Sequence, residues 1–427
     1  MEQTQNMVNN KVSVMAENLI GSEIIKLAGE VKAKIAQGEK IYNLTIGDFN
    51  PLLFPIPTAL KNEIVEAYVN NETNYPAANG VEELRVQVAD FLKTRQGLDY
   101  SPNSILISGG ARPLIFALYQ TVIDKNDTVL FPVPSWNNNH YSHLSGAKQQ
   151  IIETKPENDF MPTAAELKPY IKEATMLALC SPLNPTGTTF TKEGLAEICQ
   201  LVLEENQRRG ADEKPLYLLF DQIYWVLTYG ETQHFDPVSL FPEMRDYTIY
   251  IDGISKAFAA TGVRVGWAFG PQKVMDKMKA ILSHVGAWSP KAEQVATANF
   301  LANKAEVDEY LHAFKKNIHK RLDAFYIGMT KLKAKGYNVD AIPPQAAIYL
   351  TVKFDLVGKT TANGHVLENI ADVTAYLLNK AHIAIVPFYA FGTSPSSPWY
   401  RLSVGTADYN EIDNMFDLIE KALTELH

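Results

Sequence analysis

Between about residues 104 and 270, the chain alternates short apolar runs with polar or Gly/Pro turns and amphipathic helical stretches. The apolar runs are continuous, which is typical of strands that helices cover on both faces. We therefore expect an α/β fold with a mostly parallel, seven-stranded sheet. The expected strands are residues 104–108, 128–131, 150–153, 176–180, 216–220, 247–251 and 264–269.

The pattern also predicts helices with recognisable ends. Residues 192–209 lie between Thr191, a typical N-cap, and Gly210, a typical stop. Over residues 290–335, apolar residues recur at helical spacing without an internal proline, which predicts one long helix that connects two domains. The pattern then changes to strands at 347–353, 383–387 and 400–404, with helices at 371–381 and 410–426.

The length of the chain indicates more than one domain. The sequence has 427 residues, and a single hydrophobic core stops growing at about 250 to 300 residues. We expect an N-terminal arm and part of a small domain at residues 1–55, a large domain at 56–310, and the C-terminal part of the small domain at 311–427. The small domain would be α+β and built from both ends of the chain.

Composition and charge exclude several classes of protein. The chain is 46% hydrophobic and 20% charged, as globular enzymes are, and its net charge is −9. It has no run of five basic residues, so we expect neither a nucleic-acid nor a membrane partner. No apolar run approaches the ~18 residues that span a bilayer, and residues 1–10 are polar. With only Cys180 and Cys199, we expect no disulfides, no metal site and a cytoplasmic location.

Four short segments each follow an expected strand, at the edge where open α/β sheets collect their ligands. Gly110 precedes an expected helix, and small residues there let backbone amides approach a phosphate. Asp221 ends a buried strand and needs a cation or hydrogen-bond donors. Lys256 has small and apolar neighbours, which favour the neutral, nucleophilic amine. Taken singly, these features are more often a structural turn, a capping carboxylate and a solvated surface lysine. The segments are 108–112, 181–187, 221–224 and 252–258.

In combination, the segments resemble the pyridoxal-phosphate-dependent aminotransferases of class I/II, which have the aspartate aminotransferase-like fold type I. The resemblance covers nearly the whole chain, from Gly47 to Arg401. It rests on Asn184-Pro185-Thr186-Gly187, then Asp221 and Tyr224 about 37 residues later, then Ser255-Lys256 about 35 residues after that, and Arg264 eight residues beyond the lysine.

The resemblance implies that the large domain binds pyridoxal 5′-phosphate. Lys256 would form the internal aldimine with this cofactor and then move the proton of the reaction as an acid and base. Asp221 would keep the pyridine nitrogen protonated, and Trp136 would stack on the ring. Tyr224 and Asn184 would hydrogen-bond its phenolic oxygen.

The resemblance also implies how the phosphate is bound. The phosphate would contact one set of residues within the same subunit, and Tyr75 would reach it from the neighbouring subunit of a homodimer. The set comprises the backbone amides around Gly110, Ala111 and Arg112, together with the side chains of Ser255 and Arg264.

By the same resemblance, the enzyme is a transaminase of amino acid metabolism. It would transfer the amino group of an L-amino acid to a 2-oxo acid, taken to be 2-oxoglutarate. Arg401 would bind the α-carboxylate in a fork-to-fork pair, close to Gly47 and Asn184. The amino donor stays open: Arg112, His284 or Lys291 would favour a dicarboxylate, whereas Tyr349, Phe388 and Tyr389 would favour an aromatic or large apolar side chain.

Three positions depart from the family pattern. Gly253 stands where the aspartate-type subgroup has a serine, which removes one expected phosphate hydroxyl. Phe388 and Ala346 stand where glycine is common. These differences concern the shape of the pocket.

Two other functions are compatible with part of this pattern. A β-eliminating lyase or an aminocyclopropane-forming relative would use the same cofactor residues. A ligand-sensing module of a regulator is disfavoured, because only about forty residues precede Gly47 and the net charge is acidic.

Overall fold

The computed structural model describes residues 12–19 and 23–427. The polar stretch 1–10, on which the expected location partly rests, lies outside the described residues. Among the helices of the described part, none combines the length and the apolar character needed to cross a bilayer.

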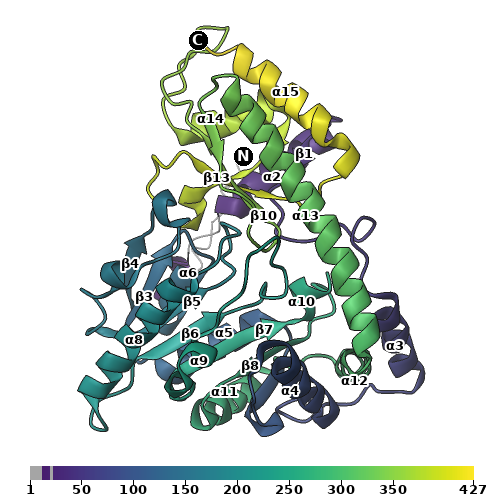
Figure 1. The fold of residues 1–427 in the computed structure, drawn as a ribbon, viewed down its shortest axis with the longest axis vertical. Coiled ribbons are helices and arrows are strands. Elements are labelled where there is room, and N and C mark those ends of the chain that lie inside the picture. Colours follow the sequence, from purple (N-terminus) through teal and green to yellow (C-terminus); the bar gives the residue numbers. More distant parts are fainter. Residues whose placement is uncertain (1–11, 20–22) are drawn as a thin grey trace, which may run out of the picture.

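A seven-stranded sheet forms the centre of the larger lobe (Figure 1). All its neighbouring strands are parallel except β8, which is antiparallel to both β2 and β7. The mostly parallel sheet predicted from the sequence is therefore confirmed. In spatial order, its strands are β2 (Ile105–Ser108), β8 (Gly266–Phe269), β7 (Thr248–Gly253), β6 (Tyr217–Asp221), β5 (Ala174–Cys180), β3 (Thr128–Val133) and β4 (Lys148–Glu153).

Burial on both faces explains the continuous apolar runs. Within β6, Leu218 and Phe220 belong to one hydrophobic cluster, whereas Leu219 belongs to a second. The first cluster includes residues of α4 (Glu82–Gln96) and α8 (Lys192–Arg209), and the second includes residues of α5 (Ala111–Val122) and α11 (Gln272–Val285). Successive residues of a strand point to opposite faces, so a sheet covered on both sides needs apolar residues throughout.

The predicted long helix over residues 290–335 is wrong in one respect. The structure has two helices there, α12 (Lys291–Ala302) and α13 (Lys304–Ala334). Asn303 separates them with a ψ of 78°, and its side chain accepts a hydrogen bond from the backbone of Glu306. Asparagine favours such caps. Helix α13 alone runs from the larger to the smaller lobe (Figure 1).

Both ends of the described chain contribute to the smaller lobe. Strand β1 (Tyr42–Asn43) pairs in parallel with β11 (Ile383–Ala384), far away in the sequence. A four-stranded antiparallel sheet lies beside this pair, and the helices α14 (Ile370–Tyr376) and α15 (Ile412–Thr424) belong to the same lobe (Figure 1). In spatial order, the sheet contains β12 (Val386–Pro387), β13 (Trp399–Ser403), β10 (Tyr349–Phe354) and β9 (Val339–Ala341).

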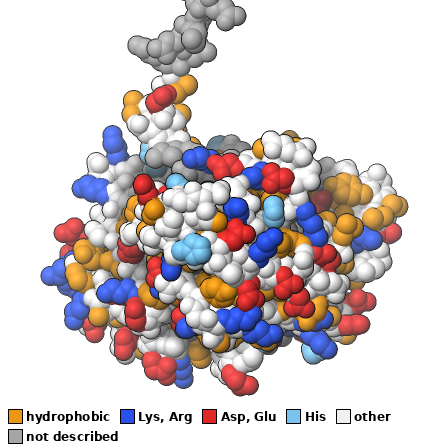
Figure 2. All heavy atoms as spheres, turned by 90° about the horizontal axis from the view of Figure 1, so that it is seen from above, with side chains coloured by type: hydrophobic (Ala, Val, Ile, Leu, Met, Phe, Trp, Pro, Cys, Tyr) orange, Lys and Arg blue, Asp and Glu red, His pale blue; other side chains and the backbone are white. Residues whose placement is uncertain are grey.

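Acidic and basic side chains are mixed on the face of the molecule that lies at the top in Figure 1. Figure 2 shows them interspersed on this face, with hydrophobic side chains scattered between them. Such a mixed surface offers a phosphate backbone no extended basic area to bind.

Gly328 of α13 lies where α15 packs, and an added Cβ there would overlap the ring of Phe416. Alanine favours a helix over glycine by about 1 kcal/mol, but overpacking costs about 1 to 3 kcal/mol. We therefore expect Gly328→Ala to lower the thermal unfolding midpoint measured by calorimetry. Gly29→Ala in α2 (Glu23–Ala36), where no atom lies within 4 Å of the added Cβ, should raise it. A rise in both variants would contradict this packing.

Candidate active site

A cavity of about 660 Å³ opens at the carboxyl ends of the central strands, and residues of both lobes line it. The parallel strands β5 and β6 end here, so the side chains that follow them converge on one space. Most of the predicted site residues line this cavity: Gly47, Ala111, Arg112, Trp136, Asn184, Asp221, Tyr224, Ser255, Lys256, Arg264 and Arg401.

Lys256 lies on the short helix α10 (Ile254–Ala257), directly after β7. Its Nζ donates a hydrogen bond to the carbonyl oxygen of Gly47 at 2.5 Å. Burial lowers the pKa of Lys256 to about 8, although the nearby Asp48 carboxylate acts in the opposite direction. Near neutral pH the amine therefore exists in both protonated and neutral forms, as a nucleophile or a general base requires.

Asp221 ends β6, and its Oδ1 accepts a hydrogen bond from the backbone N–H of Ile223 at 3.1 Å. Burial raises the pKa of Asp221 to about 6, so at pH 7 most of the carboxyl groups are still ionised. A buried carboxylate of this kind is stabilised by a cationic partner. The arrangement is suited to a ring nitrogen that carries a proton.

Helix α5 begins directly after Gly110 and faces Arg264. Gly110 has a φ of +99°, and any Cβ there would overlap the Arg264 guanidinium. Arg264 itself donates to the carbonyl oxygens of Gly109 at 2.8 Å and Thr261 at 2.6 Å. The first amides of a helix have no partner within the helix and favour negative charge. This corner of the cavity can therefore bind a phosphate.

Arg401 of β13 is only 2% exposed. Its Nη1 donates to Asn184 Oδ1 at 3.1 Å and its Nη2 to the carbonyl oxygen of Thr45 at 2.5 Å. The Nε has no partner among the described residues. Burial lowers the pKa of the guanidinium. Arg401 lines the cavity, and each Nη carries a second N–H, so the guanidinium can bind a carboxylate there.

Trp136 and Arg112 form one wall of the cavity. The guanidinium of Arg112 lies 5.5 Å from the centre of the Trp136 ring, and that ring lies 6.1 Å from the ring of Phe391. The indole is thus held on two sides and can present a flat surface to a ligand.

The hydroxyl groups of Tyr224 and Tyr349 lie 2.6 Å apart and form a buried hydrogen bond. Sequence reasoning considered Tyr349 only as a contact for the substrate side chain and missed this pair. It also missed Asp48, which lines the cavity and accepts a hydrogen bond from Thr261 Oγ1 at 2.7 Å. The position of Asp48 directly after Gly47 is the signal that could have revealed it.

Several candidate residues lie elsewhere. Tyr75 is 81% exposed, its ring lies 5.2 Å from that of Trp288, and it does not line the cavity of its own subunit. Lys291 forms an ion pair with Glu72 at 2.7 Å. Phe388 is fully buried and packs 5.1 Å from Phe160. Of the side chains considered for substrate selection, Arg112 and Tyr349 line the cavity, whereas His284, Lys291, Phe388 and Tyr389 do not.

Packing accounts for the departure from the family pattern at Gly253. A Cβ at Gly253 would lie 2.8 Å from the Cα of Gly266 and from the carbonyl oxygen of Val265. A serine therefore does not fit this pairing of β7 and β8. Its absence reflects contact between two strands.

Comparisons with known proteins agree with this geometry. The model of the family "Aminotransferase class I and II" matches residues 39–419. An aspartate aminotransferase of Bacillus sp. (strain YM-2) is 27% identical over 415 residues, which cover 96% of each chain. A probable aspartate/prephenate aminotransferase of Rhizobium leguminosarum bv. phaseoli is 29% identical over 390 residues, or 89% of this chain and 90% of the relative. The crystal structure of the aspartate aminotransferase from Rhizobium meliloti aligns with a TM-score of 0.88 and 25% identity, covering 98% and 100% of the two chains.

The lowered pKa of Lys256 can be measured by labelling the ligand-free protein with cyanate and quantifying each modified peptide by mass spectrometry. We expect the labelling rate of Lys256 to rise with pH around a midpoint near 8. A model peptide, Nα-acetyl-lysine amide, labelled in the same reaction should respond around the usual value of about 10.4. Parallel pH profiles for Lys256 and the model peptide would contradict the effect of burial.

Proposed function

This chain belongs to the class I and II aminotransferases, and from that membership we propose how its own residues carry out the reaction. The protein is a transaminase, an enzyme that moves an amino group between an amino acid and a 2-oxo acid. We propose that the donor is an L-amino acid, that the acceptor is 2-oxoglutarate, and that pyridoxal 5′-phosphate is bound at Lys256.

One observation carries this proposal: an amine, a carboxylate and two guanidinium groups from distant parts of the sequence line one cavity. They belong to Lys256, Asp221, Arg264 and Arg401. Each of these groups is costly to bury alone. A shared ligand with an aldehyde, a ring nitrogen, a phosphate and a neighbouring carboxylate accounts for all four together.

The residues present fit pyridoxal phosphate. The space beside Gly110 and Arg264 suits the phosphate, Asp221 suits the ring nitrogen, and Trp136 suits the face of the ring. When bound, this cofactor supplies a sink for the electrons left on the amino acid's Cα after its proton is removed. The chain must provide the rest: orientation, charge and a group that moves the proton.

Lys256 is the residue that we assign to proton movement. Its amine is next to the carbonyl oxygen of Gly47 and within the influence of Asp48 and Arg401. A pKa of about 8 makes both the acid and the base form accessible near neutral pH. The hydrogen bond with Tyr349 would hold the hydroxyl group of Tyr224 at a fixed position in the cavity near Lys256.

Arg401 is the residue that we assign to the α-carboxylate of the substrate. Asn184 and the carbonyl of Thr45 fix the guanidinium plane from two sides. The relatives named aspartate and aspartate/prephenate aminotransferases support a dicarboxylic partner. We assign the second carboxylate to the side chain of Arg112, which lines the cavity over Trp136.

We propose that residues 56–310 hold the cofactor and that residues 1–55 and 311–427 close over the substrate, because Gly47 and Arg401 come from those outer segments. A cytoplasmic location agrees with the free thiols of Cys180 and Cys199.

We propose that the active form is a homodimer. Large apolar side chains are exposed on and beside α3 (Thr58–Val69), which is typical of a surface that a partner covers. Tyr75 lies close by in the sequence and is itself exposed, so it would reach the phosphate of the other subunit. The exposed side chains are Leu52, Val65, Tyr68, Val69 and Tyr75.

The reaction can be tested with protein supplemented with pyridoxal phosphate. We expect L-aspartate and 2-oxoglutarate to yield glutamate and the 2-oxo acid of aspartate in equal amounts, without release of ammonia. Borohydride should attach the cofactor to the peptide that contains Lys256. Lys256→Ala should lose activity by at least about a thousandfold, whereas Lys279→Ala on the surface of α11 should keep it. Ammonia in place of glutamate would identify an eliminating lyase instead.

The contribution of Tyr75 across the dimer can be tested by subunit mixing. Tyr75→Ala and Lys256→Ala should each be impaired. Half of the randomly mixed dimers are hybrids, and each hybrid has one complete site, so mixing should restore about a quarter of the wild-type activity. Mixing Trp136→Ala with Lys256→Ala should restore none, since Trp136 lines the cavity of its own subunit. Failure of the first mixture to recover would place Tyr75 outside the site.

A further inference from the structure

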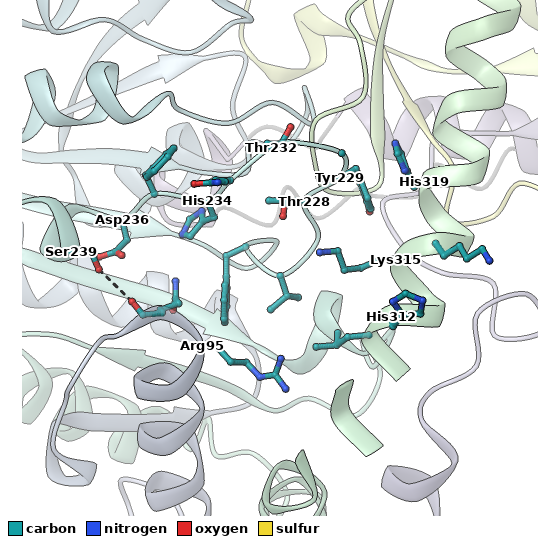
Figure 3. A pocket seen from close by; sticks show the side chains of 18 of the residues that line it. Arg95, Thr228, Tyr229, Thr232, His234, Asp236, Ser239, His312, Lys315 and His319 are labelled. Atoms are coloured by element: carbon teal, nitrogen blue, oxygen red, sulfur yellow. Dashed lines mark hydrogen bonds between the residues drawn. The ribbon is translucent and has the colours of Figure 1, made fainter. Parts of the chain in front are cut away.

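A second, larger cleft of about 1040 Å³ lies outside the active site (Figure 3). Three parts of the fold line it: the end of α4, the segment 225–240 that follows β6, and helix α13. The reaction proposed above uses none of its side chains. The residues important here are Arg95, Trp225, Tyr229, His234, Lys315 and Lys316.

The cleft is basic, although the chain as a whole carries a charge of −9. Arg95, Lys315 and Lys316 line it together with one carboxylate, and a second carboxylate, Asp308, is paired with Arg95. The carboxylate that lines the cleft, Asp236, accepts hydrogen bonds from the backbone of Val238 and from the hydroxyl of Tyr250, so it is already engaged within the fold.

Lys315 and Lys316, the two lysines of α13 that line the cleft, have no carboxylate partner among the described residues. Lys315 is partly buried, and burial lowers the pKa of its amine. Arg95, in contrast, forms an ion pair with Asp308 at 2.5 Å. A partly buried amine without a counter-ion is costly. The cost is recovered when an anion occupies the cleft.

His234 provides an independent observation on the opposite wall. Both of its ring nitrogens are buried, and neither has a hydrogen-bond partner in the described part of the chain. Burial lowers the pKa of His234 to about 3, so the ring is neutral and keeps one N–H donor and one acceptor. Figure 3 shows His234 and Asp236 on one side of the cleft and His312, Lys315 and His319 on the other. Buried polar atoms of this kind normally have a partner.

We propose that this cleft binds a small polyanion, a metabolite that carries two or more carboxylate or phosphate groups. Lys315 and Lys316, which have no carboxylate partner, would meet its charges, and His234 would donate a hydrogen bond. The volume suits a small molecule. The walls include the rings of Trp225 and Tyr229, as is usual for ligand sites.

The cleft and the active site share the segment that follows β6. Asp221, which ends β6, and Tyr224 line the active site, and the segment that follows directly, with Trp225 and Tyr229, lines the cleft. The hydroxyl of Tyr229 donates to the carbonyl oxygen of Ala347 at 2.5 Å, two residues before Tyr349. A polyanion in the cleft would therefore contact this segment and the helix α13 that joins the lobes, and we expect its binding to be coupled to that of the substrate.

The test is calorimetric titration of the cofactor-loaded protein with citrate and, separately, with inorganic pyrophosphate at constant ionic strength. We expect saturable binding of at least one probe, one per subunit. The double variant Lys315→Ala/Lys316→Ala should weaken it about tenfold or more. Lys331→Ala, an exposed lysine of the same helix outside the cleft, and Arg401→Lys in the active site should leave it unchanged.

Several results would overturn the proposal. They are the absence of saturable binding of both probes, an equal loss in Lys331→Ala, which would indicate general charge attraction, and a loss in Arg401→Lys, which would place the probe in the active site. Saturating L-aspartate should change the dissociation constant of the probe about fivefold, and an unchanged value would overturn the coupling. The titrations without amino acid involve no turnover and do not depend on the proposed reaction, whereas the coupling to L-aspartate rests on the proposed function.

Discussion

The buried guanidinium of Arg401 is the constraint on which the architecture of the site depends. A charge this deep is tolerated only where hydrogen-bond acceptors surround it. Here they come from the N-terminal segment through Thr45 and from the larger lobe through Asn184, while the arginine itself lies in the smaller lobe. The group therefore joins three parts of the chain. Arg401 also lines the cavity, so a substrate carboxylate bound there, as proposed, would add to the interaction that unites the lobes.

Burial away from water also shifts the pKa values of two other groups that line the cavity, in opposite directions. Burial lowers the pKa of Lys256 and raises that of Asp221, because in both cases the neutral form is favoured. For the amine this is useful, since a proton must leave and return near neutral pH. For the carboxylate it is a cost that the protonated ring nitrogen of the proposed cofactor would offset. One physical effect, desolvation, thus prepares two groups for different tasks.

The sequence predicts the sheet because strands covered on both faces must be apolar throughout, as in β6. It also predicts Lys256, Asp221 and Arg401 as site residues, because their positions after strands and their motif spacing are local properties. The break at Asn303 was not predicted, since its helical pattern continues on both sides and only the backbone angle reveals the cap. The Tyr224 to Tyr349 hydrogen bond and the burial of Phe388 depend on contacts between distant segments. No periodicity within one segment encodes such contacts.

In both cavities, a few placed cations stand against the acidic net charge of the chain. An acidic chain repels its anionic ligands at long range, so recognition must come from cations placed where water is excluded and the attraction is strong. Arg264 and Arg401 satisfy this condition in one cavity, and Lys315 satisfies it partly in the other. The segment after β6 lies between them, with Tyr224 on one side and Trp225 on the other. Because the two residues share one backbone segment, the polyanion proposed to bind beside Trp225 would also limit the movement of the backbone that carries Tyr224.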